Sequence, residues 1–282
     1  MVRAHKKRFA VTLNVFREIR ACWRILQVIA LVFGGIAIVR LLFPFWSKPR
    51  QRRIKQAWSA RLVATLGVRI DATGPQIPEQ TLIVSNHISW LDVFVINALT
   101  PATFVCKDDV KSWPAIGWLV EHTGTLFIER GSRAAAARSA QAMTARFGAG
   151  ERVAIFPEGT TTQGTHLLPF RAALFEAAVS AAARVQPLAL QYQDAAGQLS
   201  RAPAYDGDIS FGESMLAIVR SNGLKARLQI LPLLDTSESR RELALASESS
   251  IAQALGFMNP EGEQTEAECA VDSAAEAQAQ AA

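Results

Sequence analysis

Short apolar runs alternate with stretches of helical spacing from Val68 onward, and this alternation constrains the fold most. The runs with strand character are Thr81–Ser85, Thr103–Cys106, Thr125–Ile128, Val153–Phe156, Val185–Gln191 and Arg227–Leu231. The stretches with helical spacing are Trp90–Leu99, Pro114–His122, Arg133–Phe147, Phe170–Arg184 and Ser214–Ser221. Alternation of this kind favours helices on both faces of a mainly parallel sheet. The sequence therefore predicts an α/β fold with a mixed, mainly parallel sheet flanked by helices.

The basic residues are concentrated at the amino end of the chain. Residues 1–62 carry fourteen Lys and Arg against Glu18 alone, whereas the rest of the chain holds sixteen basic and twenty-four acidic residues. Fifteen uncharged residues lie between Arg24 and Arg40, and apolar residues resume from Leu41 to Trp46. A basic end serves nucleic acid or anionic lipid, and the apolar stretch favours lipid. We expect an N-terminal membrane-anchoring helical segment and no nucleic-acid partner.

The anchor either crosses the bilayer once or enters and returns on one side. Fifteen residues are fewer than the roughly 20 that a span needs, but a snorkelling Arg40 would extend the stretch to Trp46. Basic residues on both flanks leave the orientation open. A signal peptide and a buried core helix are the alternatives, although no small-residue cleavage site precedes Lys48. The basic, amphipathic segment Arg50–Leu66 predicts a helix on the membrane surface or packed on the body.

A His and an Asp, separated by four residues, follow the first predicted strand. The segment Asn86-His87-Ile88-Ser89-Trp90-Leu91-Asp92 places them where a strand ends and a helix begins, a position at which α/β proteins commonly carry function. A His that takes a proton, beside a carboxylate that orients its ring, can activate a hydroxyl group. A structural histidine beside an apolar strand is the alternative.

Polar residues also follow two later predicted strands. Gly124–Arg130 ends in Arg130, whose planar guanidinium suits phosphate or carboxylate, with an exposed surface arginine as the alternative. In Phe156-Pro157-Glu158-Gly159-Thr160-Thr161, the proline stiffens the strand exit and Gly159 permits a turn or a close approach to a ligand. Glu158 and Thr160 present polar groups there. An ordinary turn is the alternative.

Together with the proline-interrupted run Val185-Gln186-Pro187-Leu188, these segments resemble the motifs of the glycerolipid acyltransferase family in order and spacing. The match runs from about Thr81 to Leu190 and includes Lys107, Pro114, Gly117 and Gly124. Members of this family acylate lysophosphatidic acid and related lysolipids at membranes. The resemblance implies that the chain is an O-acyltransferase.

The resemblance also implies roles for single residues. His87 would be the general base on the free hydroxyl of the lysolipid, and Asp92 would orient its imidazole and stabilise the charged form. The hydroxyl would attack the thioester of acyl-CoA or acyl-carrier protein, which is a co-substrate, and we expect no cofactor. The family assigns head-group binding to Arg130, Glu158 and Gly159. A carboxylate repels phosphate, so Glu158 is expected to bind a hydroxyl or a cationic group, and backbone N–H groups near Gly159 and Thr160 could stabilise the oxyanion.

Thr161 departs from the family pattern. The best-known lysophosphatidic acid enzymes have Arg at this position, whereas here Thr161-Thr162-Gln163-Gly164 follows and the nearest later arginine is Arg171. The Thr-Thr-x-Gly continuation resembles the branch that includes lyso-ornithine lipid acyltransferases, whose head group carries an amino acid. We expect 1-acyl-sn-glycerol-3-phosphate as the acceptor and lyso-ornithine lipid as the alternative. A non-catalytic lipid-binding protein is disfavoured by the presence of both His87 and Asp92, and a thioester hydrolase by the lack of a Ser or Cys elbow.

The division of the chain follows from these assignments. We expect residues 1–66 to form the membrane anchor and surface helix, residues 67–235 the acyltransferase catalytic domain, and residues 236–282 a helical to disordered tail. Cys22, Cys106 and Cys269 have neither metal-ligand spacing nor evident disulfide pairing, so we expect a reducing compartment and no metal site. The expected location is the inner (cytoplasmic) membrane, with the catalytic domain facing the cytoplasm.

Overall fold

The computed structural model describes residues 2–107, 111, 116–128, 133–234 and 239–257. Within these ranges, seven strands form one sheet in the order β1-β7-β6-β2-β5-β3-β4. The strands are β1 (Val68–Thr73), β2 (Thr81–Ser85), β3 (Thr103–Lys107), β4 (Leu126–Ile128), β5 (Val153–Ile155), β6 (Arg184–Gln193) and β7 (Leu224–Ile230). Their pairings are parallel except that of β6 with β7. The predicted mixed, mainly parallel α/β sheet is confirmed.

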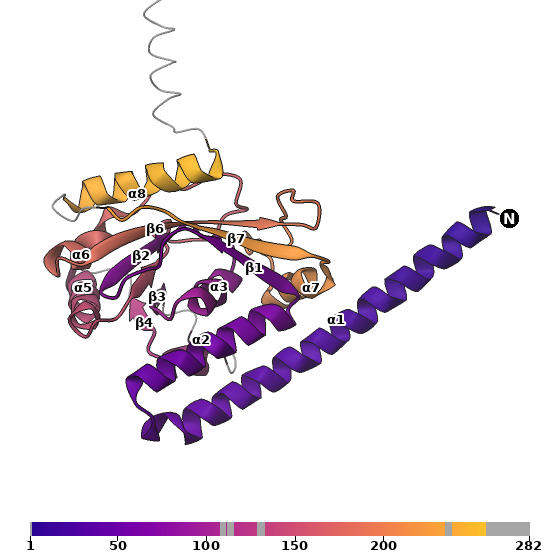
Figure 1. The fold of residues 1–282 in the computed structure, drawn as a ribbon, viewed down its shortest axis with the longest axis horizontal. Helices are drawn as coiled ribbons and strands as arrows, with labels where there is room; N and C mark the ends of the chain where they lie inside the picture. Colours follow the sequence, from indigo (N-terminus) through magenta and orange to yellow (C-terminus); the bar gives the residue numbers. More distant parts are fainter. Residues whose placement is uncertain (1, 108–110, 112–115, 129–132, 235–238, 258–282) are drawn as a thin grey trace, which may run out of the picture.

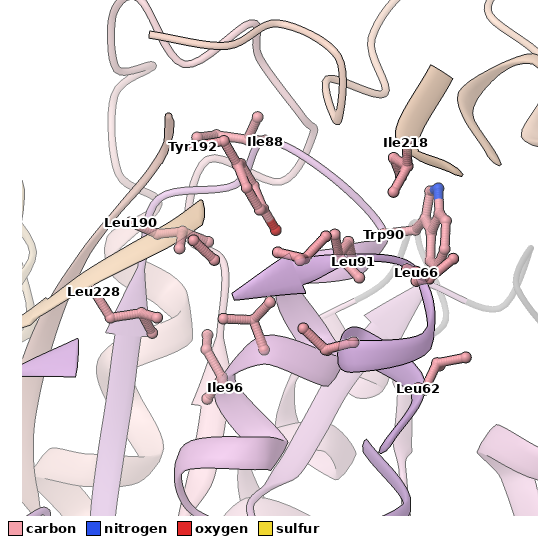
Figure 2. Close-up of a cluster of buried hydrophobic side chains, with 14 of the residues drawn as sticks. Leu62, Leu66, Ile88, Trp90, Leu91, Ile96, Leu190, Tyr192, Ile218 and Leu228 are labelled. Carbon is pink, nitrogen blue, oxygen red and sulfur yellow. The ribbon is translucent and has the colours of Figure 1, made fainter. Parts of the chain in front are cut away.

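Helices cover both faces of the sheet (Figure 1). They are α1 (Val2–Leu41), α2 (Lys48–Thr65), α3 (Leu91–Leu99), α4 (Ile116–His122), α5 (Arg133–Gly148), α6 (Glu176–Ser180), α7 (Phe211–Arg220) and α8 (Arg240–Leu255), with short 3-10 turns at η1 (Phe43–Phe45) and η3 (Ala172–Phe175). Side chains alternate across a strand. In β2, Ile83 packs in the core with α2, α3 and α7, whereas Leu82 and Val84 pack in the second core with α5, α6 and α8. Part of the first core is drawn in Figure 2.

Two elements differ most from the sequence-based prediction. No strand is predicted at Val68–Thr73, yet β1 forms the sheet edge and pairs with β7. Only Val68 in this strand is buried, so β1 carries little of the apolar pattern that identifies a strand. The predicted helix Phe170–Arg184 is shorter, because α6 ends at Ser180 and Ala182 takes a left-handed φ of 47° before β6 begins. The alanine-rich composition favours a helix there, but the chain must turn to enter the central strand.

Pro187 lies inside β6, a central strand, where proline is uncommon because it lacks an N–H group. Its carbonyl accepts a hydrogen bond from Leu231 N at 3.0 Å, beside the antiparallel ladder with β7. Pro187 cannot donate a bond in return, and the side-chain amide of Gln186 donates to the Leu231 carbonyl instead. A neighbouring side chain thus replaces the missing backbone donor.

From Glu18 onward, helix α1 lies beside α7 and α2, whereas its amino-terminal part extends beyond the body (Figure 1). On its inner face Ala21 and Val28 are buried, and the Arg24 guanidinium donates to Val219 O at 2.8 Å and to Ser221 O at 3.3 Å. Its outer face carries exposed apolar side chains at helical spacing, namely Phe16, Ile19, Trp23, Leu26, Ile29 and Phe33. The segment Val15–Leu41 is long and apolar enough to cross a membrane. Helix α1 is therefore the apolar helix that the sequence predicts.

Helix α2 packs on the body. Ser59, Leu62 and Val63 are buried on its inner side, and Trp58 Nε1 donates to Leu31 O of α1 at 3.0 Å. Of the two arrangements that the sequence leaves open for this basic segment, the structure has the packed one. Exposed arginines remain on its outer side, among them Arg53 and Arg61.

Candidate active site

The loop between β2 and α3 carries His87 and is fixed to the neighbouring strand by Asn86. The side chain of Asn86 donates from Nδ2 to Leu190 O at 2.9 Å and accepts from Leu190 N at 2.8 Å. Both bonds are buried, and they continue the pairing of β2 with β6 beyond the last residue of β2. The backbone next to His87 is therefore held at the carboxyl end of the sheet.

His87 and Asp92 form a direct pair. His87 Nδ1 lies 2.8 Å from Asp92 Oδ2, the imidazole side chain is 19% exposed, and Asp92 is fully buried in the first turn of α3. Asp92 Oδ2 also accepts from the N–H groups of Ile88 at 2.7 Å and Ser89 at 2.9 Å. A carboxylate is favoured at a helix N-terminus. Because Nδ1 is bound to Asp92, Nε2 is the ring nitrogen left to accept a proton.

Tyr192 completes the surroundings of Asp92. Its hydroxyl donates to Asp92 Oδ1 at 2.7 Å, and the fully buried ring stands in the core beside Ile88 (Figure 2). Burial and the neighbouring Asp92 carboxylate raise the pKa of Tyr192 well above its ordinary value of 10.0, so the hydroxyl stays a donor. Asp92 thus accepts from four donors, which compensate its buried charge. Nothing in the local sequence links positions 92 and 192, and the predicted strand ends at Gln191.

The ring of Phe156 fixes the plane of the His87 imidazole. The two rings stack with centroids 3.9 Å apart and an interplanar angle of 9°. Phe156 directly follows β5, the neighbour of β2 in the sheet, so both rings come from the carboxyl ends of adjacent parallel strands. Stacking from one side and the Asp92 bond at Nδ1 restrict rotation of the imidazole about both of its side-chain torsions.

Glu158 connects the loop after β5 to the backbone of His87. Its carboxylate is buried, with Oε1 accepting from His87 N at 2.7 Å and Oε2 accepting from Leu168 N at 2.9 Å. Burial raises the pKa of Glu158 to about 7, although these two backbone bonds act in the opposite direction. Thr162 N adds a bond to His87 O at 2.9 Å. Glu158 is therefore a support between two loops, and its part in head-group binding stays a prediction.

Gly159 allows a guanidinium to approach the turn closely. It has a left-handed φ of 72°, and a Cβ at this position would lie 2.8 Å from Cζ of Arg171. A side chain here would meet both backbone strain and this contact. The exposed Arg171 thus places a positive charge beside Gly159, a contact that the spacing of the two residues in the sequence does not predict.

Of the two predicted oxyanion donors, the N–H of Gly159 is already bonded within the turn. Gly159 N donates to Phe156 O at 3.1 Å, so Thr160, whose side chain is exposed, carries the next backbone N–H in the turn. The hydroxyl of Thr161 donates to the carbonyl of Tyr205. The structure brings together His87, Asp92, Glu158, Gly159 and Thr160. Arg130 lies outside the described residues.

Comparison with known proteins shows the family to which the chain belongs. The family model described as Acyltransferase matches residues 69–191, a range that holds all the predicted site residues. A protein of Neisseria gonorrhoeae named 1-acyl-sn-glycerol-3-phosphate acyltransferase is 34% identical over 199 residues, which cover 70% of this chain and 78% of that relative. The chain belongs to the glycerolipid acyltransferase family. The predicted family and the enzyme class are thereby confirmed, and the non-catalytic alternative is set aside.

Relatives within the acyltransferase family carry two kinds of name. A lyso-ornithine lipid O-acyltransferase of Pseudomonas aeruginosa is 35% identical over 208 residues, which cover 73% of this chain and 80% of that relative. The crystal structure of the 1-acyl-sn-glycerophosphate acyltransferase PlsC of Thermotoga maritima superimposes with a TM-score of 0.65 at 18% identity, over 86% of this chain and 96% of that one. This likeness shows the acyltransferase fold.

Proposed function

We propose that this acyltransferase moves a fatty acyl group from acyl-CoA or acyl-carrier protein to the free hydroxyl of 1-acyl-sn-glycerol-3-phosphate, which gives phosphatidic acid. The observation that carries the proposal is the His87–Asp92 pair, whose 2.8 Å bond at Nδ1 leaves Nε2 as the proton acceptor. As the hydroxyl oxygen attacks the thioester carbonyl, its proton passes to His87 Nε2. The tetrahedral intermediate then expels the thiolate, which takes the proton back from the imidazolium.

Asp92 supports this step by stabilising the imidazolium that forms on His87. Its other hydrogen bonds, from Ile88 N, Ser89 N and Tyr192, hold the carboxylate in one position while the charge on the ring changes. The oxyanion of the intermediate needs a donor as well, and the backbone N–H of Thr160 is our candidate.

A phosphate head group needs a cationic partner, and Arg171 supplies one beside the turn. Its guanidinium contacts Gly159, the residue next to Glu158, which in turn binds the backbone of His87. Guanidinium and phosphate form charge-assisted, often bidentate hydrogen bonds. We assign Arg171 the place that Arg takes directly after the Pro-Glu-Gly-Thr motif in the best-known lysophosphatidic acid enzymes. Arg130 stays a second predicted phosphate ligand.

Lyso-ornithine lipid is the alternative acceptor, and Thr161 is the observation in its favour. A threonine hydroxyl that is engaged with the Tyr205 carbonyl offers no positive charge to a phosphate. The similarity of the chain to a lyso-ornithine lipid O-acyltransferase supports the same alternative. Both acceptors react by the same chemistry at His87, so only the head group separates them.

A panel of lysolipids offered to the purified protein with labelled acyl-CoA and acyl-carrier protein tests the acceptor. We expect 1-acyl-sn-glycerol-3-phosphate to be preferred, and Arg171→Gln to raise its KM by roughly 10- to 100-fold, since hydrogen bonds to charged groups are worth about 1.5–3 kcal/mol. Thr161→Arg should lower that KM. Preference for lyso-ornithine lipid, with no effect of Arg171→Gln, would assign the enzyme to the alternative.

We also infer a monotopic attachment to the inner membrane, with the catalytic domain facing the cytoplasm. The inner face of α1 is held to α7 by Arg24 and by the Glu18–Arg220 ion pair at 2.7 Å, so α1 runs along the body. Its outer face carries the exposed apolar side chains, which would enter one leaflet. A substrate dissolved in that leaflet would then reach the enzyme without leaving the bilayer.

A further inference from the structure

A cavity lined by basic side chains lies at the edge of the sheet opposite His87. Its volume is about 190 Å³, and it is bounded by the start of α2, by the residues that precede β3, β4 and β5, and by the end of α5. Strands β2, β3, β4 and β5 are parallel, so His87 follows their carboxyl ends and this basic cavity precedes their amino ends. The cavity is therefore separate from the proposed active site.

Helix α2 contributes three basic side chains at helical spacing. Lys48, Arg52 and Lys55 lie on one face of the helix and line the cavity together with Arg146 and Arg152. The acidic side chains that line it are Glu121 and Glu151. Five basic and two acidic side chains of the described residues thus line the cavity.

The positive charges are only partly compensated. Glu151 pairs with Arg52 at 3.1 Å and with Arg146 at 3.6 Å, so one carboxylate serves two guanidinium groups. Lys55 Nζ donates to Ala102 O at 2.6 Å. Burial lowers the pKa of Lys55 to about 8, with Glu151 opposing this and Arg52 and Arg146 adding to it. An anion in the cavity would relieve the repulsion among these cations.

The cavity opens beside the apolar junction between α1 and α2. Phe43 and Lys48 of this junction line it, and Leu41, Leu42 and Phe45 next to them are exposed. Exposed apolar side chains beside basic ones are typical of a surface that meets a membrane with anionic lipids. A ligand held here could keep its phosphate in the cavity and its acyl chains in the bilayer.

We propose that the basic cavity binds the phosphate of an anionic diacyl phospholipid and thereby docks the enzyme on the membrane. Guanidinium and ammonium groups are the partners that phosphate takes in proteins, and basic pockets between membrane-associated helices hold such head groups. An acidic carrier protein would be a poorer occupant, because its thioester has to reach His87 at the other edge of the sheet.

Vesicle binding of the full chain tests this site without relying on catalysis. The variant Lys48→Gln/Arg52→Gln removes two cavity charges, and Arg53→Gln/Arg61→Gln removes two exposed charges of the same helix as the matched control. Co-sedimentation is measured with phosphatidylcholine vesicles and with vesicles that also contain phosphatidylglycerol. Thermal unfolding verifies that each variant is folded. If the loss of Arg52 prevents folding, the single variants Lys48→Gln and Arg53→Gln are compared instead.

We expect the cavity variant to lose about tenfold or more of its affinity for phosphatidylglycerol vesicles, and the control to lose clearly less. Binding to phosphatidylcholine vesicles should be the same for all. Equal losses in the two double variants would mean diffuse electrostatic attraction and would overturn the proposal. If inorganic phosphate raises the melting temperature of the wild type but the cavity variant binds vesicles normally, the cavity would be a site for a free anion and the proposal would be overturned. If the cavity variant binds vesicles normally but no longer binds acyl-carrier protein, the cavity would be a site for that protein and the proposal would be overturned.

Discussion

Asp92 is the residue on which the geometry of the site depends most. It is fully buried, and its two oxygens accept from His87, from two backbone N–H groups and from Tyr192. A buried charge is tolerated only where such partners surround it. Each donor to Asp92 therefore acts on the orientation of the His87 ring, even where it does not touch the substrate.

Tyr192→Phe tests this arrangement at the level of one oxygen atom. The change leaves Asp92 Oδ1 without its donor, and we expect a loss of about 1–3 kcal/mol in the free energy of unfolding. Since Asp92 is then held less firmly, kcat should fall about tenfold while KM changes little. Trp90→Phe is the matched control, because it removes one buried hydrogen bond of the same core, to Ser214 Oγ at 3.1 Å. It should lower stability and leave kcat unchanged, and a fall of kcat in both variants would contradict the role given to Tyr192.

Glu158 makes stability depend on pH in a defined direction. Its pKa rises from 4.5 to about 7 on folding, so between these pH values the folded protein holds a proton that the unfolded chain has released. This contribution is complete below pH 4.5 and is lost as the pH rises through 7, by up to about 3 kcal/mol. Glu158→Gln cannot titrate. Denaturant unfolding at several pH values should show the stability of the wild type, relative to that of the variant, falling from pH 5 to pH 8, and a rise over this range would contradict the assignment.

At the scale of elements, the sequence predicts the buried central strands and misses the edge strand. Strands such as Thr81–Ser85 are predicted because all their residues are apolar or small and buried on both faces. The edge strand β1 has one buried residue and is missed. The alanine-rich stretch before β6 has strong helix propensity, and it still ends early because the central strand has to begin.

The contacts of the site fall into two groups: those within one short segment, which the sequence predicts, and those between distant segments, which it does not. His87 and Asp92 lie on one short segment, and their pairing can be predicted from their spacing. The bond from Glu158 to His87 N spans 71 residues and that from Tyr192 to Asp92 spans 100. These contacts depend on which strands become neighbours in the sheet, which no local pattern encodes. The proximity of Arg171 to Gly159 belongs to this second group.

The contact between α1 and α7 gives a prediction for the stability of the whole helix α1. Arg24 binds the last carbonyls of α7, where a cation is favoured, and its guanidinium also packs against Gly67. Arg24→Ala should speed hydrogen exchange in α1 and at the end of α7, and should cost about 1–3 kcal/mol of stability. Arg40→Ala, at an exposed position near the end of the same helix, is the control and should change neither. Unchanged exchange in Arg24→Ala would show that α1 is held by other contacts.

For the whole molecule, the main consequence of the fold is that one body carries both an exposed apolar face and the candidate active site. The exposed apolar face of α1 and the carboxyl edge of the sheet with His87 belong to one body, because α1 is bonded to α7 and packs on α2. An enzyme whose acceptor is a membrane lipid needs both features at once. Membrane association is therefore built into the catalytic body and is more than a tether.

Replacing two of the exposed α1 side chains tests this surface. Trp23→Gln/Phe33→Gln should reduce vesicle binding by at least about tenfold, because burying a large apolar side chain is worth about 1.5–3 kcal/mol. Transfer to substrate dispersed in detergent should persist. Leu199→Gln/Leu245→Gln changes two exposed residues outside α1 and is the control. Equal binding of both variants would contradict the membrane face.

The most direct test of the account is acyl transfer by His87→Ala. We expect kcat to fall by about 10²- to 10⁴-fold with every lysolipid that the wild type accepts, since the general base is lost. The melting temperature should stay within a few degrees, because His87 is partly exposed and its backbone bonds to Glu158 and Thr162 remain. His122→Ala, at an exposed histidine of α4, should transfer at the wild-type rate. Full transfer by His87→Ala would contradict the proposed mechanism.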